Sequence, residues 1–148
     1  MAAPSNNTPQ SIVQAFQSLA LSEGLSKKSR AYKERRRDFI ANSVQTGFIA
    51  QFGANTSSLQ SWNRLCETVL GDVSDRDLTS IRKCKGVLKG VFVNLIDLVD
   101  AANASTNIRR TFTSSKDLSL YIKQTKKIFP KERAKSNPLL RQFLIVVN

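Results

Sequence analysis

The hydrophobic positions of this chain recur every three or four residues, the spacing of a helix that buries one face. The first such segment has apolar residues at positions 12, 13, 16, 19 and 20 and ends at Gly24, a residue suited to a helix C-terminus. Thr8 followed by Pro9 supplies the cap and the first-turn proline that are typical of a helix start. The pattern therefore predicts an amphipathic helix from about residue 9 to residue 23.

The same periodicity predicts further helices along the rest of the chain. Serine, asparagine and glycine mark their expected ends: Ser26 and Gly53 bound one helix, Ser57 or Ser58 and Gly71 bound the next, and Asn94 begins a short buried one. Another helix is expected from near Leu78 to residue 88, one from Ser114 or Ser115 through Lys127, and a last one over residues 139–147.

These segments predict an all-α protein with a single compact domain of about six or seven helices. The domain would span residues 9–148, after a disordered N-terminal tail over residues 1–8 that is small and polar. The closing segment FLIVV is rich in β-branched residues, so a strand there is the alternative to a helix. A length of 148 residues is enough for one hydrophobic core without disulfides or metals.

The charge balance narrows the classes of partner. The chain carries 23 Lys and Arg against 11 Asp and Glu, a formal charge of +12. Such an excess favours nucleic acid, an anionic membrane surface or an acidic protein through long-range attraction. No apolar run approaches the roughly 20 residues that a membrane span needs.

The chain has no histidine and only two cysteines, which limits its chemistry. Ser–His and Cys–His nucleophile pairs are excluded, and so are zinc sites that need histidine or four thiolates. Asp97 and Asp100 lie three positions apart, but the sequence offers no matching catalytic partner for them. The prediction is a protein that is not an enzyme and that needs no metal or cofactor. Trp62, Cys66 and Cys84 lie on apolar stripes and are expected in the core.

A dense basic run, SKKSRAYKERRRDF, begins at Ser26 and places seven Lys and Arg in residues 27–37. Projected on a helix, Tyr32 and Phe39 mark a buried side. Arg36 adjoins this side, so its guanidinium must either extend to solvent or find a partner. The opposite side carries a row of cations, namely Lys27, Arg30, Lys33 and Arg37. Glu34 and Asp38 lie close enough to offset part of this charge by pairing along the helix.

A second basic face is predicted on the helix that begins near Ser114, where Lys116, Lys123 and Lys127 lie together, followed by Lys131, Arg133 and Lys135. The sequence leaves open whether the two faces meet in the fold. The candidate nucleic-acid-binding residues are Lys27, Lys28, Arg30, Lys33, Arg37, Lys116, Lys123, Lys127 and Lys131.

Two other interpretations of the run at residues 27–37 stay open, a solvated helix face and a nuclear import signal. The aromatic residues Tyr32, Trp62 and Tyr121 all lie on apolar faces, which leaves few rings for stacking on bases. Phosphate contacts are therefore favoured over recognition of single strands.

Five segments, SKKSRAYKERRRDF, LQSWNRLCETV, SIRKCKGVLKGVFVNLIDLVD, YIKQTKKIFPKERAK and LLRQFL, together resemble a group of short, predicted-helical proteins of filamentous fungi. The resemblance covers residues 24–144. It implies one helical domain and a fungal origin, and it carries over no functional residues.

The function expected from the sequence is nucleic-acid binding, to DNA or RNA, mainly through phosphate contacts with little sequence specificity. A nuclear location is expected, with the cytoplasm as the alternative. The alternative function is a helical protein-interaction module, an adaptor or effector, that docks an acidic partner. Self-association through the apolar C-terminus is also left open.

Overall fold

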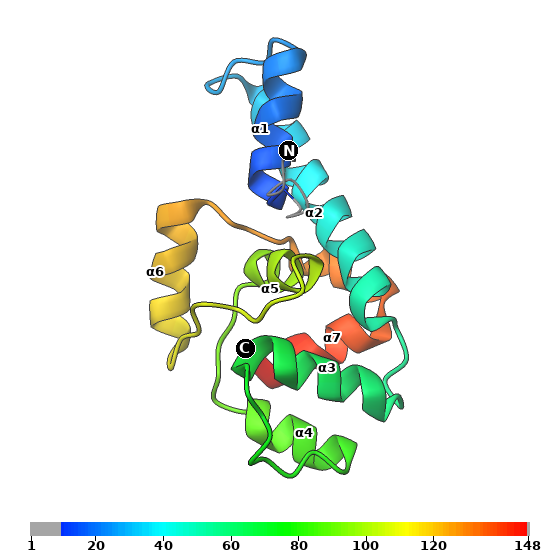
Figure 1. Ribbon diagram of the computed structural model, residues 1–148. Coiled ribbons are helices and arrows are strands. Elements are labelled where there is room, and N and C mark those ends of the chain that lie inside the picture. The colour runs from blue at the N-terminus through cyan, green and yellow to red at the C-terminus, as the bar shows by residue number, and fades with distance from the viewer. Residues whose placement is uncertain (1–9, 148) are drawn as a thin grey trace, which may run out of the picture.

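Helices make up the regular structure of residues 10–147, the part of the chain that the computed structural model describes (Figure 1). They are α1 (Ile12–Ser22), α2 (Arg30–Phe52), α3 (Leu59–Leu70), α4 (Ile81–Leu88), α5 (Leu95–Asn103), α6 (Ser115–Thr125), the 3-10 helix η2 (Lys131–Ser136) and α7 (Pro138–Val147). One isolated antiparallel bridge joins Phe92 to Phe112, and these residues contain no β-strand. The all-α prediction is confirmed, and the chain forms a single domain.

Serine and asparagine side chains begin the seven α-helices. In each helix the side-chain oxygen of the capping residue accepts a hydrogen bond from a backbone N–H of the first turn, which otherwise has no partner. The caps are Ser11, Ser29, Ser58, Ser80, Asn94, Ser114 and Asn137. The predictions for Ser58, Asn94 and Ser114 are confirmed. The predicted cap of the first helix is wrong, because Ser11 and not Thr8 caps α1; Thr8 and Pro9 themselves lie outside the described residues.

Four predicted helix boundaries are wrong by a few residues. Helix α1 begins at Ile12 rather than near residue 9, because Ser11 caps it. The helix expected after Ser26 begins after Ser29, because the Ser29 side chain accepts from the N–H of Tyr32, while residues 26–29 form a turn closed by the Ser29 N–H on the Ser26 carbonyl. Similarly, α4 begins after Ser80 rather than near residue 78. Helix α6 ends at Thr125 instead of including Lys127, since Lys126 adopts a left-handed conformation with φ 61°.

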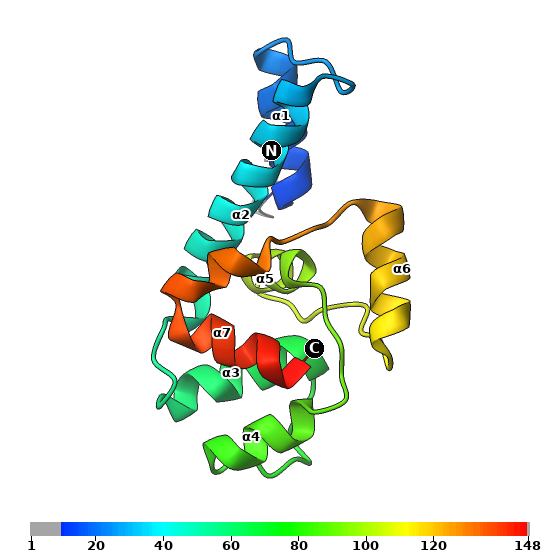
Figure 2. The same ribbon diagram turned by 180° about the vertical axis from the view of Figure 1, so that it is seen from behind.

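Helix α1 and the N-terminal half of α2 form a hairpin that projects from the body of the molecule (Figures 1 and 2). Phe16 of α1 is fully buried between Tyr32 and Phe39 of α2, with ring centres 5.1 Å and 5.5 Å away. The predicted buried side of the basic run is therefore confirmed, although Tyr32 and Phe39 themselves are only half-buried.

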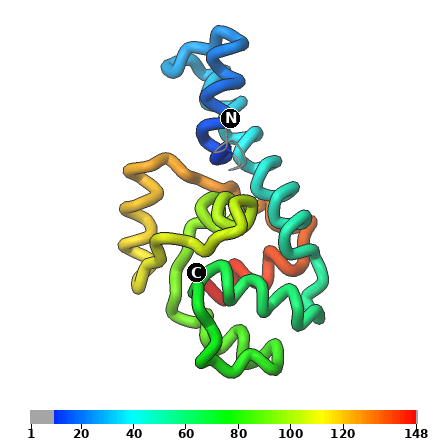
Figure 3. The backbone as a smooth tube through the Cα atoms, in the orientation of Figure 1, coloured from blue at the N-terminus to red at the C-terminus, as the bar shows by residue number. Residues whose placement is uncertain are grey.

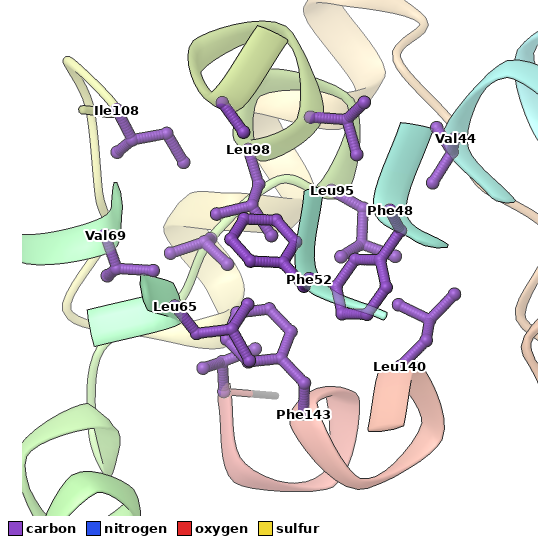
Figure 4. Packing of buried hydrophobic residues seen from close by; sticks show 14 of the residues in the cluster. Val44, Phe48, Phe52, Leu65, Val69, Leu95, Leu98, Ile108, Leu140 and Phe143 are labelled. Atoms are coloured by element: carbon purple, nitrogen blue, oxygen red, sulfur yellow. The ribbon is translucent and has the colours of Figure 1, made fainter. Parts of the chain in front are cut away.

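The main core lies in the body of the molecule, where the C-terminal half of α2 meets α3, α5 and α7 (Figure 4). Phe48 and Phe52 of α2 pack together with ring centres 5.0 Å apart, and Phe143 of α7 lies 6.3 Å from Phe48. Trp62 is fully buried, as predicted, and its indole N–H donates to the carbonyl of Thr56 over 3.0 Å. Helix α7 takes part in this core, so the alternative of a closing strand is wrong.

Cys66 and Cys84 are also fully buried, as predicted, and both are free thiols. They link α3 to α4, because the Cys66 thiol donates to the carbonyl of Cys84 over 3.5 Å. Burial, followed by the proximity of Cys84, raises the pKa of Cys66 to about 12. Cys66 is therefore an uncharged, weakly reactive thiol at neutral pH.

The backbone path in Figure 3 shows α5 lying across α2 in the middle of the fold. Gly47 lies at this crossing, where a side-chain Cβ would collide with Cγ1 of Val99. A glycine here lets the two helices approach closely.

The tail predicted for residues 1–8 lies outside the part of the chain that the structure describes. Within the described part, no helix is long and apolar enough to cross a bilayer.

Candidate nucleic-acid interface

The basic run divides between a turn and a helix. Lys27 and Lys28 lie exposed in the turn that joins α1 to α2, at the tip of the projecting hairpin (Figure 1). Arg30, Lys33 and Arg37 are exposed along the first two turns of α2. The prediction that Lys27 belongs to the helical row of cations is thus wrong, and the row is shorter than predicted.

Carboxylates neutralise part of this row. Arg30 pairs with Glu34 one turn later, with Nε and Oε1 2.9 Å apart, which confirms the pairing along the helix predicted for Glu34. The same prediction is wrong for Asp38, which pairs with Arg133 of η2. Arg37 instead reaches Glu132 of η2, at 2.6 Å between Nη2 and Oε1. The pKa of Glu132 is lowered by a hydrogen bond that its carboxylate accepts from its own backbone N–H and by the bond from Arg37, so Glu132 is ionised at neutral pH. Lys33, one turn before Arg37, has no carboxylate within 4 Å in the described part of the chain.

The remaining arginines of the run hold the hairpin in place. Arg35 pairs with Glu23 at the end of α1, with Nη1 and Oε1 2.8 Å apart. Half-buried Arg36 donates from Nη1 to the backbone carbonyl of Lys126 over 2.7 Å. Of the two alternatives expected for Arg36, the structure shows the second, a partner, which lies 90 residues away in the sequence.

The contact between Arg36 and Lys126 begins a polar seam, in which residues 126–136 run along α2. Arg133 pairs with Asp38 of α2 at 3.0 Å between Nη2 and Oδ1. Gln45, two turns further along α2, donates to the carbonyl of Arg133 over 2.6 Å. The seam places the second half of the later basic segment beside the first basic run, a juxtaposition that the sequence left open.

Lys127 does not lie on the exposed basic face of α6 where the sequence placed it. It lies beyond the end of α6, and its ammonium is half-buried against Asp97, with Nζ and Oδ1 2.8 Å apart. The phenol of Tyr121 donates to the other oxygen of Asp97 over 2.6 Å, and the buried side chain of Asn94 donates to the Lys127 carbonyl over 2.9 Å. Lys127 therefore fastens the end of α6 to the start of α5.

The pKa values of this cluster follow from that pairing. Burial disfavours the charged form of Lys127, but the hydrogen bond and the charge of Asp97 outweigh it and raise the pKa of Lys127. Burial, and then the hydrogen bond to Asp97, raise the pKa of Tyr121. Lys127 and Tyr121 thus both keep their protons at neutral pH, and the charge of Lys127 is already matched by Asp97.

The other candidate lysines are exposed. Lys131 begins η2 and lies next to Glu132, the partner of Arg37. Lys123 lies in the last turn of α6, near the end that leads to the seam, whereas Lys116 lies in the first turn at the far end of that helix (Figure 2). Helix α6 stands apart from the other helices in both views, and Leu118 is its one buried residue.

The structure thus sorts the nine candidates into two groups. Arg30, Arg37 and Lys127 are paired with carboxylates. Six others have no carboxylate within 4 Å in residues 10–147: Lys27, Lys28, Lys33, Lys116, Lys123 and Lys131. Lys126 and Lys135 share this property and lie on the seam segment, but the sequence reasoning missed them as candidates.

Exposed ammonium groups can bind anions, and in particular a chain of phosphates. The part of the chain that the structure describes contains no group of three or more Asp, Glu and Cys side chains placed to hold a metal ion. No family model, curated protein or solved structure matches this chain. The resemblance to fungal proteins therefore stays a prediction.

Proposed function

We propose that this protein binds nucleic acid, DNA or RNA, through phosphate contacts with little dependence on base sequence. The observation that carries the proposal is the polar seam between α2 and residues 126–136. Through it, Arg37 on α2 is joined to Glu132 on η2, the residue that follows Lys131, and Lys33 lies one turn before Arg37. A single polyanion that follows this surface would contact both basic segments.

The acids of the seam support this proposal by their position. Glu132 and Asp38 bridge the two elements and are used in ion pairs, so they hold cations from both elements together. Lys33 and Lys131 remain without a carboxylate partner in the described residues and are available for phosphates. The acids reduce the total positive charge of the surface, but their ion pairs hold η2 against α2.

Phosphates rather than bases are the proposed targets, since the described chain offers no exposed aromatic ring. Tyr32, Phe39, Phe92, Tyr121 and Phe129 are half-buried, and the other aromatic residues of this part are buried. Proteins that bind single strands commonly stack bases on exposed rings. We therefore expect similar affinity for duplexes of different sequence, and a nuclear location is part of the proposal.

The test measures binding to a labelled duplex by fluorescence anisotropy at several salt concentrations. If six lysines contact phosphates, the slope of log K against log salt is about −5. Changing Lys33 and Lys131 together to Gln should reduce the magnitude of that slope by about 2 and weaken binding to every duplex alike. The matched control is Arg82→Gln with Lys89→Gln, which removes the same charge from α4.

Two results would contradict the proposal. One is the absence of binding at low salt. The other is an equal loss in the seam variant and the α4 control, because this would show that overall charge, and not the seam, attracts the duplex. Circular dichroism of both variants establishes that each is folded before binding is compared.

A further inference from the structure

Helix α4 carries a second cationic face, which the proposed function does not use. Arg82, Lys85 and Lys89 follow one another at i, i+3 and i+7, so they lie on one side of this helix and its C-cap. Gly86 lies among them, at i+4. No acidic residue occurs in Ile81–Leu88, and the fourth cation, Lys83, points elsewhere and pairs with Asp77 at 2.7 Å.

Gly86 is an unusual residue for this position. Glycine in the interior of a helix costs about 1 kcal/mol relative to alanine. Neither close packing nor a positive φ requires it here, because a Cβ at Gly86 would meet no atom within 4 Å. This contrasts with Gly47, where Val99 blocks a side chain. Gly86 therefore leaves open space in front of the α4 backbone.

That space is part of a groove between α4 and α7. The groove has a volume of about 290 Å³ and is lined by Lys85, Gly86, Lys89, Ile145 and Val146. Ile145 is 70% exposed, the highest exposure of any described large hydrophobic residue after Leu21. An exposed aliphatic side chain beside an open backbone notch is a surface that a partner could cover.

Lys85 is held at the edge of this groove. Its ammonium donates to Oε1 of Gln142 over 3.2 Å and lies 5.3 Å from the ring centre of Trp62. Arg82 and Lys89 are exposed, and neither has a carboxylate within 4 Å in residues 10–147. The groove is therefore apolar at its centre and cationic at its margins.

We propose that the α4–α7 groove binds an acidic polypeptide segment that inserts an aliphatic side chain between Gly86 and Ile145. Carboxylates of the segment would pair with Arg82, Lys85 and Lys89, while its aliphatic residue covers Ile145. A nucleic acid could match the cations, but its phosphates would leave Ile145 without an apolar contact. The mixed chemistry of the groove thus favours a protein segment.

This surface is separate from the proposed nucleic-acid interface. Helix α4 lies at the end of the molecule opposite the tip of the α1–α2 hairpin (Figure 1). The two proposals use different residues, so either one can fail without the other.

The probe for the test is a synthetic helical peptide rich in glutamate, with leucines at i, i+3, i+4 and i+7. A control peptide has the leucines replaced by glutamine at the same net charge. Titration of the full chain, followed by backbone amide NMR, should show saturable shifts in α4 and α7 with the leucine peptide. We expect the glutamine peptide to bind at least tenfold more weakly, the size expected for losing one buried aliphatic contact.

Variants of the chain locate the contact. Ile145→Ser and Gly86→Leu should each weaken the leucine peptide about tenfold, the first by removing the apolar contact and the second by filling the groove. Ile49→Ser is the matched control, because Ile49 is 52% exposed on α2, away from the groove. Thermal melts should show that all three variants are folded, since none of these positions is buried.

Several outcomes would overturn the inference: equal binding of the two peptides, no saturable binding at millimolar concentration, or wild-type affinity in Ile145→Ser. Loss of duplex binding in Arg82→Gln with Lys89→Gln, with no effect on the peptide, would assign the face to nucleic acid instead. Concentration-dependent dimerisation that Ile145→Ser abolishes, with no peptide binding, would assign the groove to a second copy.

Discussion

The same substitution, glycine to alanine, should change the stability of this protein in opposite directions in two helices. Both Gly47 in α2 and Gly86 in α4 lie within helices, where alanine is favoured by about 1 kcal/mol. At Gly86 the added methyl group meets no atom within 4 Å. At Gly47 it collides with Cγ1 of Val99 on α5, in the close crossing of the two helices.

The magnitudes follow from these surroundings. Gly86→Ala should stabilise the protein by about 0.5–1 kcal/mol, the helix preference alone. At Gly47 the same gain is opposed by overpacking, which typically costs about 1–3 kcal/mol when a core has no room. Because the helix preference is common to both variants, Gly47→Ala should be less stable than Gly86→Ala by about 1–3 kcal/mol.

Urea unfolding followed by circular dichroism measures both free energies of unfolding. Val99→Ala provides the decisive control, because it removes the methyl group that the new Cβ would strike. In the double variant the penalty of Gly47→Ala should disappear, giving a coupling energy of about 1–3 kcal/mol. Gly47→Ala with stability equal to Gly86→Ala, or a coupling energy near zero, would refute the close crossing of α2 and α5.

Three further predictions concern the two buried thiols and two half-buried charged residues, Asp100 and Lys127. In the native protein, Cys66 and Cys84 should react with a thiol reagent such as DTNB only as fast as the protein opens, because burial shields both thiols and raises their pKa. In denaturant the same thiols should react rapidly. Fast labelling of the native protein would contradict this prediction. Burial raises the pKa of Asp100 above its unfolded value of 3.8, so its ionisation lowers stability as the pH rises through the folded pKa. Asp100→Asn should therefore be more stable than wild type at pH 7 and equal to it below about pH 4, as measured by urea unfolding across pH. Lys127→Met should cost about 1–3 kcal/mol by leaving Asp97 without its cation, and an unchanged melting temperature would show that Lys127 does not fasten α6.

Most of the helices were predictable from the sequence because their signals are local. Ser58 and Gly71 bound α3 as expected, and the Asn94 side chain caps α5 through N–H groups only two and three residues away. Apolar periodicity also identified Trp62 as a core residue. The boundary errors near Ser26 and Lys127 arose where several neighbouring residues could serve as helix ends.

The candidate interface was predictable only in part. Exposure of Lys33 follows from its position on the helix, which periodicity gives directly. The partners of Arg37 and Lys127 are not local, since Glu132 and Asp97 lie 95 and 30 residues away. The cationic spacing on α4 was present in the sequence, but the open space at Gly86 depends on how α4 and α7 pack.

The sequence by itself determined an all-α chain with a large positive charge. Helix caps and apolar periodicity depend only on residues a few positions apart, and the net charge depends only on composition. The tertiary structure decided which of those charges remain available. It brought residues 126–136 onto α2 and used Arg37, Arg133 and Lys127 in ion pairs. It left Lys33 on α2 and Lys131 on η2 exposed, without carboxylate partners in the described chain. The physical reason is that ion pairing depends on distance in space, which only the packing of the helices sets.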